Sequence, residues 1–143
     1  MDGYRFSHPL RVRWAEVDGQ RIVYNANYLM YLDIAFGEYL RRELGLGESF
    51  PATVMAKTTL QYKSSLAYDE AFRVCVRTVA MGRTSFTVEF AVVKADGTIA
   101  LEAETVYVHV NDAGRPDALP ETWREAFAAY EPCLSGDTNG AST

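Results

Sequence analysis

Apolar residues recur in the first third of the chain at the spacing of a helix. From about Asn25 to Leu44 they return every three or four positions, and Gly45 then supplies a stop signal. On a helical wheel they form two stripes on roughly opposite sides, namely Ala26, Leu29, Met30, Phe36, Gly37, Leu40 and Leu44, and Tyr28, Leu32, Ala35 and Tyr39. A helix that is apolar around most of its circumference should be largely enclosed by other structure.

After this helix the spacing changes to the alternation that is typical of β-strands. Four runs alternate apolar and polar residues, at 54–62, 72–80, 86–92 and 99–107, and a shorter run covers 10–14. The connections are short, and Asp96-Gly97 favours a type I′ hairpin turn. We therefore expect a five-stranded antiparallel sheet, its four long strands in hairpin succession, curved around the long helix. This is an α+β fold.

The C-terminal part predicts one further helix and then a tail. Pro120-Glu121 suits a helix start, and Trp123, Phe127 and Tyr130 share one face. From Pro132 onward the chain offers little apolar surface to bury. We expect a single domain over residues 1–131 and a mobile tail over 132–143.

Composition and charge exclude several classes of protein. With 143 residues and a net charge of −5, the chain fits one domain and is a poor candidate for binding nucleic acid. No apolar run is long enough to span a membrane, and the first residues lack a signal peptide, so we expect a cytoplasmic protein. Cys75 and Cys133 form no CxxC motif or Cys/His cluster, and we expect neither a metal site nor a cofactor.

Asp18 is the candidate for catalysis. It precedes the predicted helix, whose first N–H groups lack partners and carry the positive end of the helix dipole. Such donors can hold an oxyanion, and a nearby carboxylate can attack a carbonyl or activate a water. The alternative is structural: Asp18 begins a turn, and Asn25 or Asn27 caps the helix. On spacing alone, the turn is the more common arrangement.

The segment from Asp18 to Leu29, with the sequence DGQRIVYNANYL, resembles the signature of hot-dog fold acyl-CoA thioesterases. This family includes 4-hydroxybenzoyl-CoA thioesterase and the Tol-Pal-associated thioesterases. The resemblance continues to about Tyr130, through segments such as Gly82-Arg83-Thr84-Ser85-Phe86. It implies a hot-dog fold and hydrolysis of an acyl-CoA to a free acid and CoA.

The resemblance also implies roles for individual residues. Asp18 falls on the catalytic aspartate, either nucleophile or general base, and Asn25 falls where a backbone N–H polarises the thioester carbonyl. Arg21 stands where many relatives have glycine. Arg83 resembles a position near the CoA phosphates, although a solvated arginine in a hairpin explains it equally well, and Lys63 is a second basic candidate near a strand end.

Asp33 is unusual because it falls within an apolar stripe of the helix. An unpaired buried carboxylate is costly, so we expect either a ligand contact or a structural hydrogen bond to a strand or another subunit. Nearby, Gly37 permits close packing or leaves room for an acyl chain. The acyl pocket is expected to draw on Tyr24, Tyr28 and the other aromatic residues of the helix and strands.

The preferred hypothesis is an acyl-CoA thioesterase that needs no metal. A thioesterase acting on acyl-carrier protein and a noncatalytic acyl-CoA-binding or regulatory module are alternatives. A hot-dog dehydratase usually needs a histidine beside the aspartate, and neither His8 nor His109 lies near Asp18 in the sequence. The resemblance implies a homodimer with a continuous sheet, which often pairs into a homotetramer, with sites between subunits.

Overall fold

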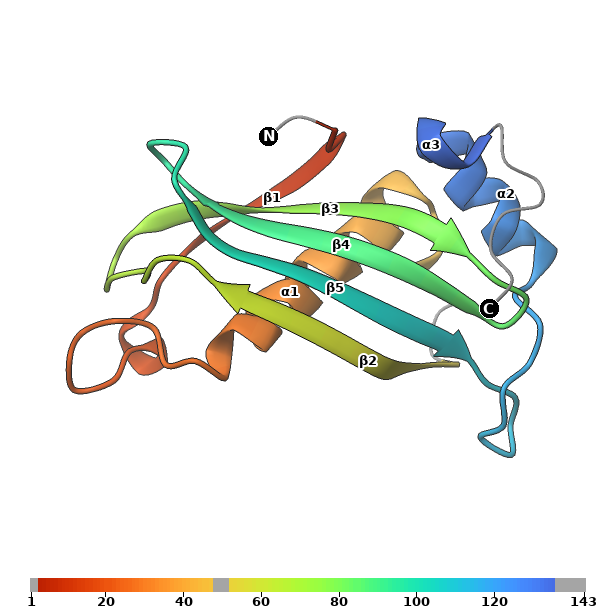
Figure 1. The fold of residues 1–143 in the computed structure, drawn as a ribbon, viewed down its shortest axis with the longest axis horizontal. Helices are drawn as coiled ribbons and strands as arrows, with labels where there is room; N and C mark the ends of the chain where they lie inside the picture. The colour runs from red at the N-terminus through yellow and green to blue at the C-terminus, as the bar shows by residue number, and fades with distance from the viewer. Residues whose placement is uncertain (1–2, 48–51, 136–143) are drawn as a thin grey trace.

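A five-stranded antiparallel sheet with one long helix across its face forms the body of the protein (Figure 1). The computed structural model describes residues 3–47 and 52–135. In chain order the elements are β1 (Phe6–Arg11), the short 3₁₀ helix η1 (Trp14–Glu16), α1 (Asn27–Glu38), the π-helical segment η2 (Tyr39–Glu43), β2 (Thr53–Tyr62), β3 (Ala71–Met81), β4 (Ser85–Lys94), β5 (Ile99–His109), α2 (Glu121–Tyr130) and α3 (Pro132–Ser135).

The strand order β1-β3-β4-β5-β2 confirms the five-stranded sheet but not the hairpin succession. We expected β2 to pair with the next strand along the chain. Instead β2 pairs with β5, from Thr53 opposite His109 to Tyr62 opposite Leu101, and lies at the edge of the sheet. The connection from β2 to β3 therefore crosses the sheet, because β3 joins β1 and β4 on the far side.

Alternation along the strands places one face of the sheet against α1. The alternating positions of β3 and β4, and those of β5 from Leu101 to Tyr107, are buried, whereas those of the edge strand β2 are half-buried or exposed. Phe36 of α1 stacks on Tyr107 of β5 with ring centroids 4.5 Å apart. The buried residues of α1 are Tyr28, Tyr31, Leu32, Ala35 and Phe36. A sheet wrapped around a central helix is thus confirmed.

The helix differs from its prediction in extent and in coverage. It starts at Asn27, two residues later than expected, and the turn Tyr39–Glu43 is π-helical. One apolar stripe is buried by the sheet. Much of the other is only half-buried, and the neighbouring Ile34 keeps 38% of its surface exposed. The expected enclosure is therefore incomplete within a single copy of the chain.

The two ends of the chain also differ from the expectation. The first strand is Phe6–Arg11 rather than 10–14, because an edge strand tolerates Pro9, whereas Trp14 already belongs to η1. At the other end α2 is confirmed, but Pro132–Ser135 form the short helix α3, which buries Leu134. The tail predicted to begin at residue 132 therefore starts too early, because 132–135 are helical. Residues 136–143 lie outside the described residues. No helix in the described ranges is long and apolar enough to cross a membrane.

Candidate active site

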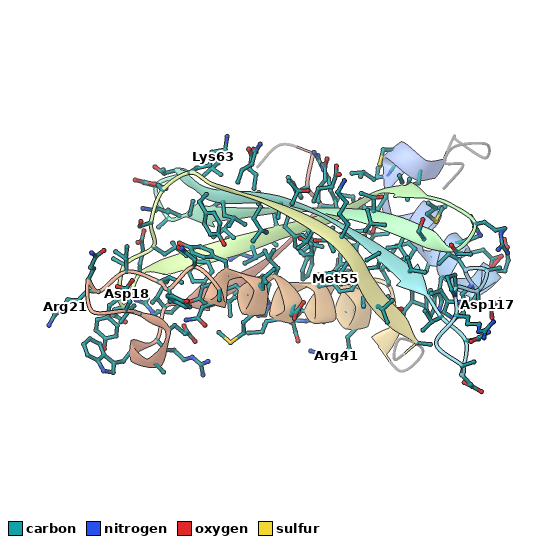
Figure 2. All side chains as sticks on the ribbon, turned by 60° about the horizontal axis from the view of Figure 1, so that its bottom comes forward. Asp18, Arg21, Arg41, Met55, Lys63 and Asp117 are labelled. Carbon is teal, nitrogen blue, oxygen red and sulfur yellow. The ribbon has the colours of Figure 1, made fainter. Side chains whose placement is uncertain are left out.

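Asp18 lies on a tight turn at one end of the sheet (Figure 2). Val17 and Val23 form an antiparallel bridge, and between them the Asp18 N–H donates to the Ile22 carbonyl at 2.9 Å. The Gln20 N–H donates to Asp18 Oδ1 at 2.8 Å. The turn thus fixes the carboxylate and leaves the side chain exposed. The structure therefore contains the turn that the spacing favoured, and it leaves the Asp18 carboxylate exposed to solvent.

Arg21 occupies the left-handed region of backbone conformation, with φ of +66°. Glycine adopts this conformation without strain, which explains why many relatives have glycine here. The Arg21 carbonyl accepts a hydrogen bond from the Tyr68 N–H at 3.1 Å, and its guanidinium lies 5.9 Å from the centroid of the exposed Trp14 ring. The arginine side chain therefore lies at the surface beside Asp18.

Glu16 anchors this turn to the helix, a role that the sequence analysis missed. Its carboxylate is buried and accepts hydrogen bonds from Arg13 N at 2.8 Å, Arg13 Nε at 2.6 Å and the Tyr31 hydroxyl at 2.8 Å. Burial raises the pKa of Glu16, but these donors outweigh it and hold the pKa below its usual range. The Glu16 carbonyl accepts from Tyr24 N and Asn27 Nδ2. No periodicity marks such a residue, because it is polar and buried outside a strand or long helix.

The start of α1 lies close to the same turn. Ala26 precedes the helix without a side-chain cap, so neither asparagine caps it; Asn27 is engaged by Glu16 instead. Asn25 is exposed, and its carbonyl accepts a hydrogen bond from the Tyr62 hydroxyl at 3.1 Å. Within the described ranges the Asn25 N–H donates to no backbone carbonyl. This donor is therefore open to an acceptor from outside the chain.

The two tyrosines predicted to bind substrate differ in their surroundings. Tyr24 is exposed next to Asn25. Tyr28 is buried, its hydroxyl accepts a hydrogen bond from Leu66 N at 3.2 Å, and its ring packs edge-on against Tyr31 and Tyr62. The structure thus places Tyr28 in the core behind the site.

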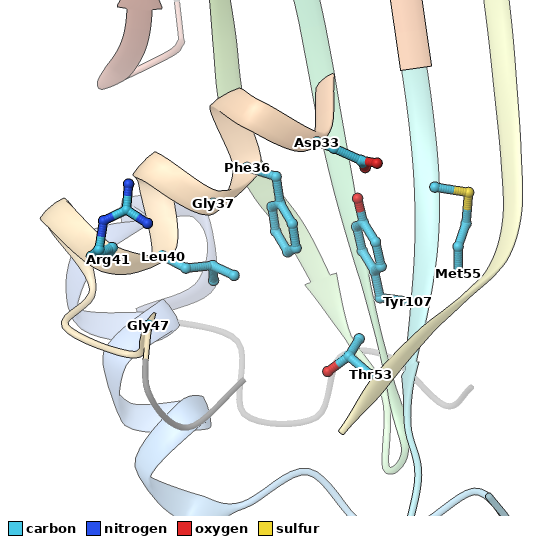
Figure 3. Close-up of a pocket in the computed structure, with 9 residues that line it drawn as sticks. All are labelled: Asp33, Phe36, Gly37, Leu40, Arg41, Gly47, Thr53, Met55 and Tyr107. Carbon is cyan, nitrogen blue, oxygen red and sulfur yellow. The ribbon is translucent and has the colours of Figure 1, made fainter. Parts of the chain in front are cut away.

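Asp33 lines a cavity of about 460 Å³ between the second half of α1 and strands β2 and β5 (Figure 3). Asp33 is exposed, contrary to the expectation of a buried carboxylate, and the partial burial of its carboxyl group against the cavity raises the pKa of that group. Among the described residues it has no hydrogen-bond or ion-pair partner, so the structural hydrogen bond is not present within this chain. Gly37 lies on the same wall, and a Cβ built there would meet no atom within 4 Å. Close packing therefore does not explain this glycine.

Lys63 and Arg83 lie at opposite ends of the sheet. Lys63 follows β2 at the end that carries Asp18 (Figure 2), and its ammonium lies 3.3 Å from Glu102 Oε1. Arg83 is exposed in the turn between β3 and β4, where its carbonyl accepts a hydrogen bond from Leu119 N. One copy of the chain therefore does not bring the two cations together. The described ranges also hold no group of three or more acidic, histidine or cysteine side chains placed to bind a metal ion.

The sequence profile of the thioesterase-like superfamily matches residues 12–127, and the chain belongs to this family. A hot-dog thioesterase, as the resemblance predicts, is thereby confirmed. The match includes the Asp18 turn, all of α1 and strands β2 to β5.

Individual relatives agree with this assignment. A putative esterase of Aquifex aeolicus is 31% identical over 125 residues, covering 81% of this chain and 92% of the relative. The acyl-CoA thioester hydrolase YbgC of Escherichia coli O157:H7 is 29% identical over 122 residues, covering 82% of this chain and 91% of the relative. Among solved structures, a thioesterase from Thermus thermophilus, complexed with coenzyme A and Zn, superposes with a TM-score of 0.84 at 30% identity, covering 92% of this chain and 98% of that one.

Proposed function

We propose that this protein hydrolyses acyl-CoA thioesters to the free acid and CoA, with Asp18 as the nucleophile or the general base. The observation that carries the proposal is the exposed Asp18 carboxylate, held by a turn that Glu16 ties to the start of α1. Similarity to the Escherichia coli acyl-CoA thioester hydrolase supports the choice of substrate.

The chemistry requires only what this site offers. The open Asn25 N–H, at the positive end of α1, polarises the thioester carbonyl and holds the oxyanion that forms on attack. As a nucleophile, Asp18 forms a mixed anhydride and releases the CoA thiolate, and water then cleaves the anhydride. As a general base, it takes a proton from the water that attacks the carbonyl. The thiolate leaves without an acid in either case.

The edge strand β2 supports a homodimer with shared sites. Two β2 edges paired antiparallel run in opposite directions, so the Tyr62 end of one protomer meets the Thr53 end of its partner. Asn25 lies at the Tyr62 end, and the cavity of Asp33 is lined by Thr53. Pairing therefore sets the Asp18 turn of one protomer beside the cavity of the other. It also covers the half-buried stripe of α1.

The carboxylate and the open N–H favour an enzyme over a noncatalytic acyl-CoA-binding module, since binding alone needs no exposed carboxylate near the carbonyl. The choice between CoA and an acyl-carrier protein rests on similarity alone. Lys63 and Arg83 are the proposed contacts for CoA phosphates, because antiparallel pairing brings the Lys63 end of one protomer to the Arg83 end of its partner.

Substitution of Asp18 by Asn tests the proposal, with Asp96→Asn as the matched control. Both aspartates precede a glycine, and each accepts a hydrogen bond from the N–H two residues later, at 2.8 Å in Asp18 and 2.9 Å in Asp96. Asn supports such turns about as well as Asp, so neither variant should lose much thermal stability.

We expect Asp18→Asn to lower kcat on the best acyl-CoA by at least roughly a hundredfold, as loss of a general base or nucleophile does. The Asp96→Asn protein should keep the wild-type rate. A folded Asp18→Asn protein with near wild-type turnover would rule out the catalytic role of Asp18. Wild-type protein that binds acyl-CoA without turning it over would favour the binding module.

A further inference from the structure

The cavity beside α1 is mostly apolar. Phe36 and Leu40 supply apolar wall, and the missing side chain of Gly37 leaves space between them (Figure 3). Its volume of about 460 Å³ falls within the usual range for small-molecule sites. Leu40 and Arg41 belong to the π-helical segment η2. π-helical turns occur frequently at functional sites.

Four polar side chains, those of Asp33, Arg41, Thr53 and Tyr107, nevertheless line this cavity. The hydroxyls of Tyr107 and Thr53 are buried, and neither has a hydrogen-bond partner among the described residues. Tyr107 is only 6% exposed, and its ring is fixed by parallel stacking on Phe36. Figure 3 shows the Tyr107 hydroxyl pointing to the side of the cavity where the Asp33 carboxylate lies. A buried hydroxyl without a partner is destabilising, so a partner beyond the described residues is expected.

We propose that this cavity holds the acyl group and that Tyr107 and Asp33 bind a hydroxyl on it, which makes hydroxyacyl thioesters the preferred substrates. This inference rests on the proposed function. Tyr107 is the specificity-determining residue: it touches the acyl group at a point remote from the thioester and takes no part in bond cleavage.

A hydroxyl fits these groups better than other polar substituents. It can donate a hydrogen bond to the Asp33 carboxylate and accept one from the Tyr107 phenol at the same time. A keto oxygen could accept a hydrogen bond from Tyr107 but could donate none to Asp33, and an unsubstituted chain would leave the buried Tyr107 hydroxyl without a partner. Burial and the nearby Asp33 charge raise the pKa of Tyr107 above its usual range, which keeps the phenol protonated as a donor.

The main alternative partner is a second copy of this chain, since the cavity opens near the β2 edge. In that case the Tyr107 hydroxyl would stabilise the dimer and would not distinguish substrates. The experiment must therefore follow both substrate preference and association.

The test compares two matched pairs of thioesters: 4-hydroxyphenylacetyl-CoA with phenylacetyl-CoA, and 6-hydroxyhexanoyl-CoA with hexanoyl-CoA. For wild-type protein we expect kcat/KM to favour the hydroxylated member of at least one pair by at least about tenfold, since sites built to bind a hydroxyl discriminate strongly against its loss. Tyr107→Phe should reduce that preference to within about threefold by slowing only the hydroxylated member, and Asp33→Asn should reduce it as well.

The control is Tyr130→Phe, which removes a hydroxyl bound to Glu43 and remote from the cavity, and its preference should equal that of wild type. Thermal stability of Tyr107→Phe should be unchanged or higher, because the hydroxyl has no partner among the residues that the structure describes. Equal rates for both members of both pairs, or a preference that survives Tyr107→Phe, would overturn the proposal. So would a Tyr107→Phe protein with weakened association and unchanged preference.

Failure of the proposed function can be distinguished from failure of the hydroxyl preference. If wild-type protein hydrolyses none of the four thioesters, their non-hydrolysable S-alkyl thioether analogues still report, by calorimetry, whether Tyr107 discriminates a hydroxyl in binding. Equal affinities in both pairs would then overturn the preference as well, whereas a difference that Tyr107→Phe abolishes would support it.

Discussion

The Tyr31 hydroxyl donates a 2.8 Å hydrogen bond to Glu16 Oε1, and this bond joins the first turns of α1 to the segment that carries Asp18. Tyr31 is itself held in the core by Phe72, whose ring centroid lies 4.8 Å away. One of the links that hold the Asp18 turn against the body of the protein therefore runs through a single tyrosine and a buried carboxylate.

We expect Glu16→Gln to loosen the Asp18 turn. An amide cannot bind Arg13 and Tyr31 as strongly as a carboxylate does, and we expect a loss of about 1–3 kcal/mol in the free energy of unfolding. Because the turn positions Asp18, kcat should fall while KM changes little. Chemical denaturation and steady-state kinetics measure the two effects. An unchanged kcat in a destabilised protein would make Glu16 purely structural.

The Glu16 carboxylate also predicts that the stability of the protein depends on pH. The pKa of Glu16 is lowered in the folded protein, so its contribution is present above the unfolded value of about 4.3 and is lost as the pH falls through the folded value. We expect wild-type protein to lose more free energy of unfolding than Glu16→Gln when the pH falls from about 6 to below the unfolded pKa of about 4.3. Denaturation curves at several pH values test this. Parallel curves would contradict it.

The backbone conformation of Arg21 predicts that replacing this residue by glycine raises stability. The effect of the same substitution on activity can be measured separately. Arg21→Gly removes the strain of a side chain at φ +66°. The free energy of unfolding should rise by about 1 kcal/mol, and the thermal midpoint should rise with it. Arg21→Ala is the control, because it removes the guanidinium but keeps the strained conformation. If Arg21 binds substrate, both variants should raise KM alike. A lower midpoint for the glycine variant would contradict the strain.

Alternation and motif residues were enough to predict most of the fold and the Asp18 turn. The burial of alternate residues follows from one-sided packing of the sheet, so Phe72, Val74 and Val76 could be placed inside without coordinates. The pairing of β2 with β5 could not, because alternation says which face is buried but not which strand is adjacent. Glu16 and Tyr107 were missed for a related reason. The importance of Glu16 lies in partners that are distant in sequence, and that of Tyr107 lies in a hydroxyl without a partner among the described residues.

The edge of β2 predicts the state of association. Val54 is 48% exposed in a single copy, so Val54→Lys should alter the stability of an isolated protomer by no more than about 0.5 kcal/mol. If two β2 edges pair, the lysines enter the interface, and we expect the dimer to dissociate and activity to fall with it. Ala95→Lys, in the exposed turn before β5, is the control. Sedimentation at micromolar concentration measures association, and a wild-type protein that is monomeric and fully active would refute the shared site.

The final prediction concerns the nucleotide end of the substrate. Lys63 and Arg83 are proposed to bind phosphates of CoA, an interaction present equally in the ground and transition states, so alanine at either position should raise KM and leave kcat nearly unchanged. Acyl-pantetheine carries the same thioester without the nucleotide, and on this substrate both variants should match wild type. Arg115→Ala, in an exposed loop, controls for the general loss of positive charge. An equal rise in KM on both substrates would place the effect at the acyl end, and an unchanged KM on acyl-CoA would remove that residue from the site.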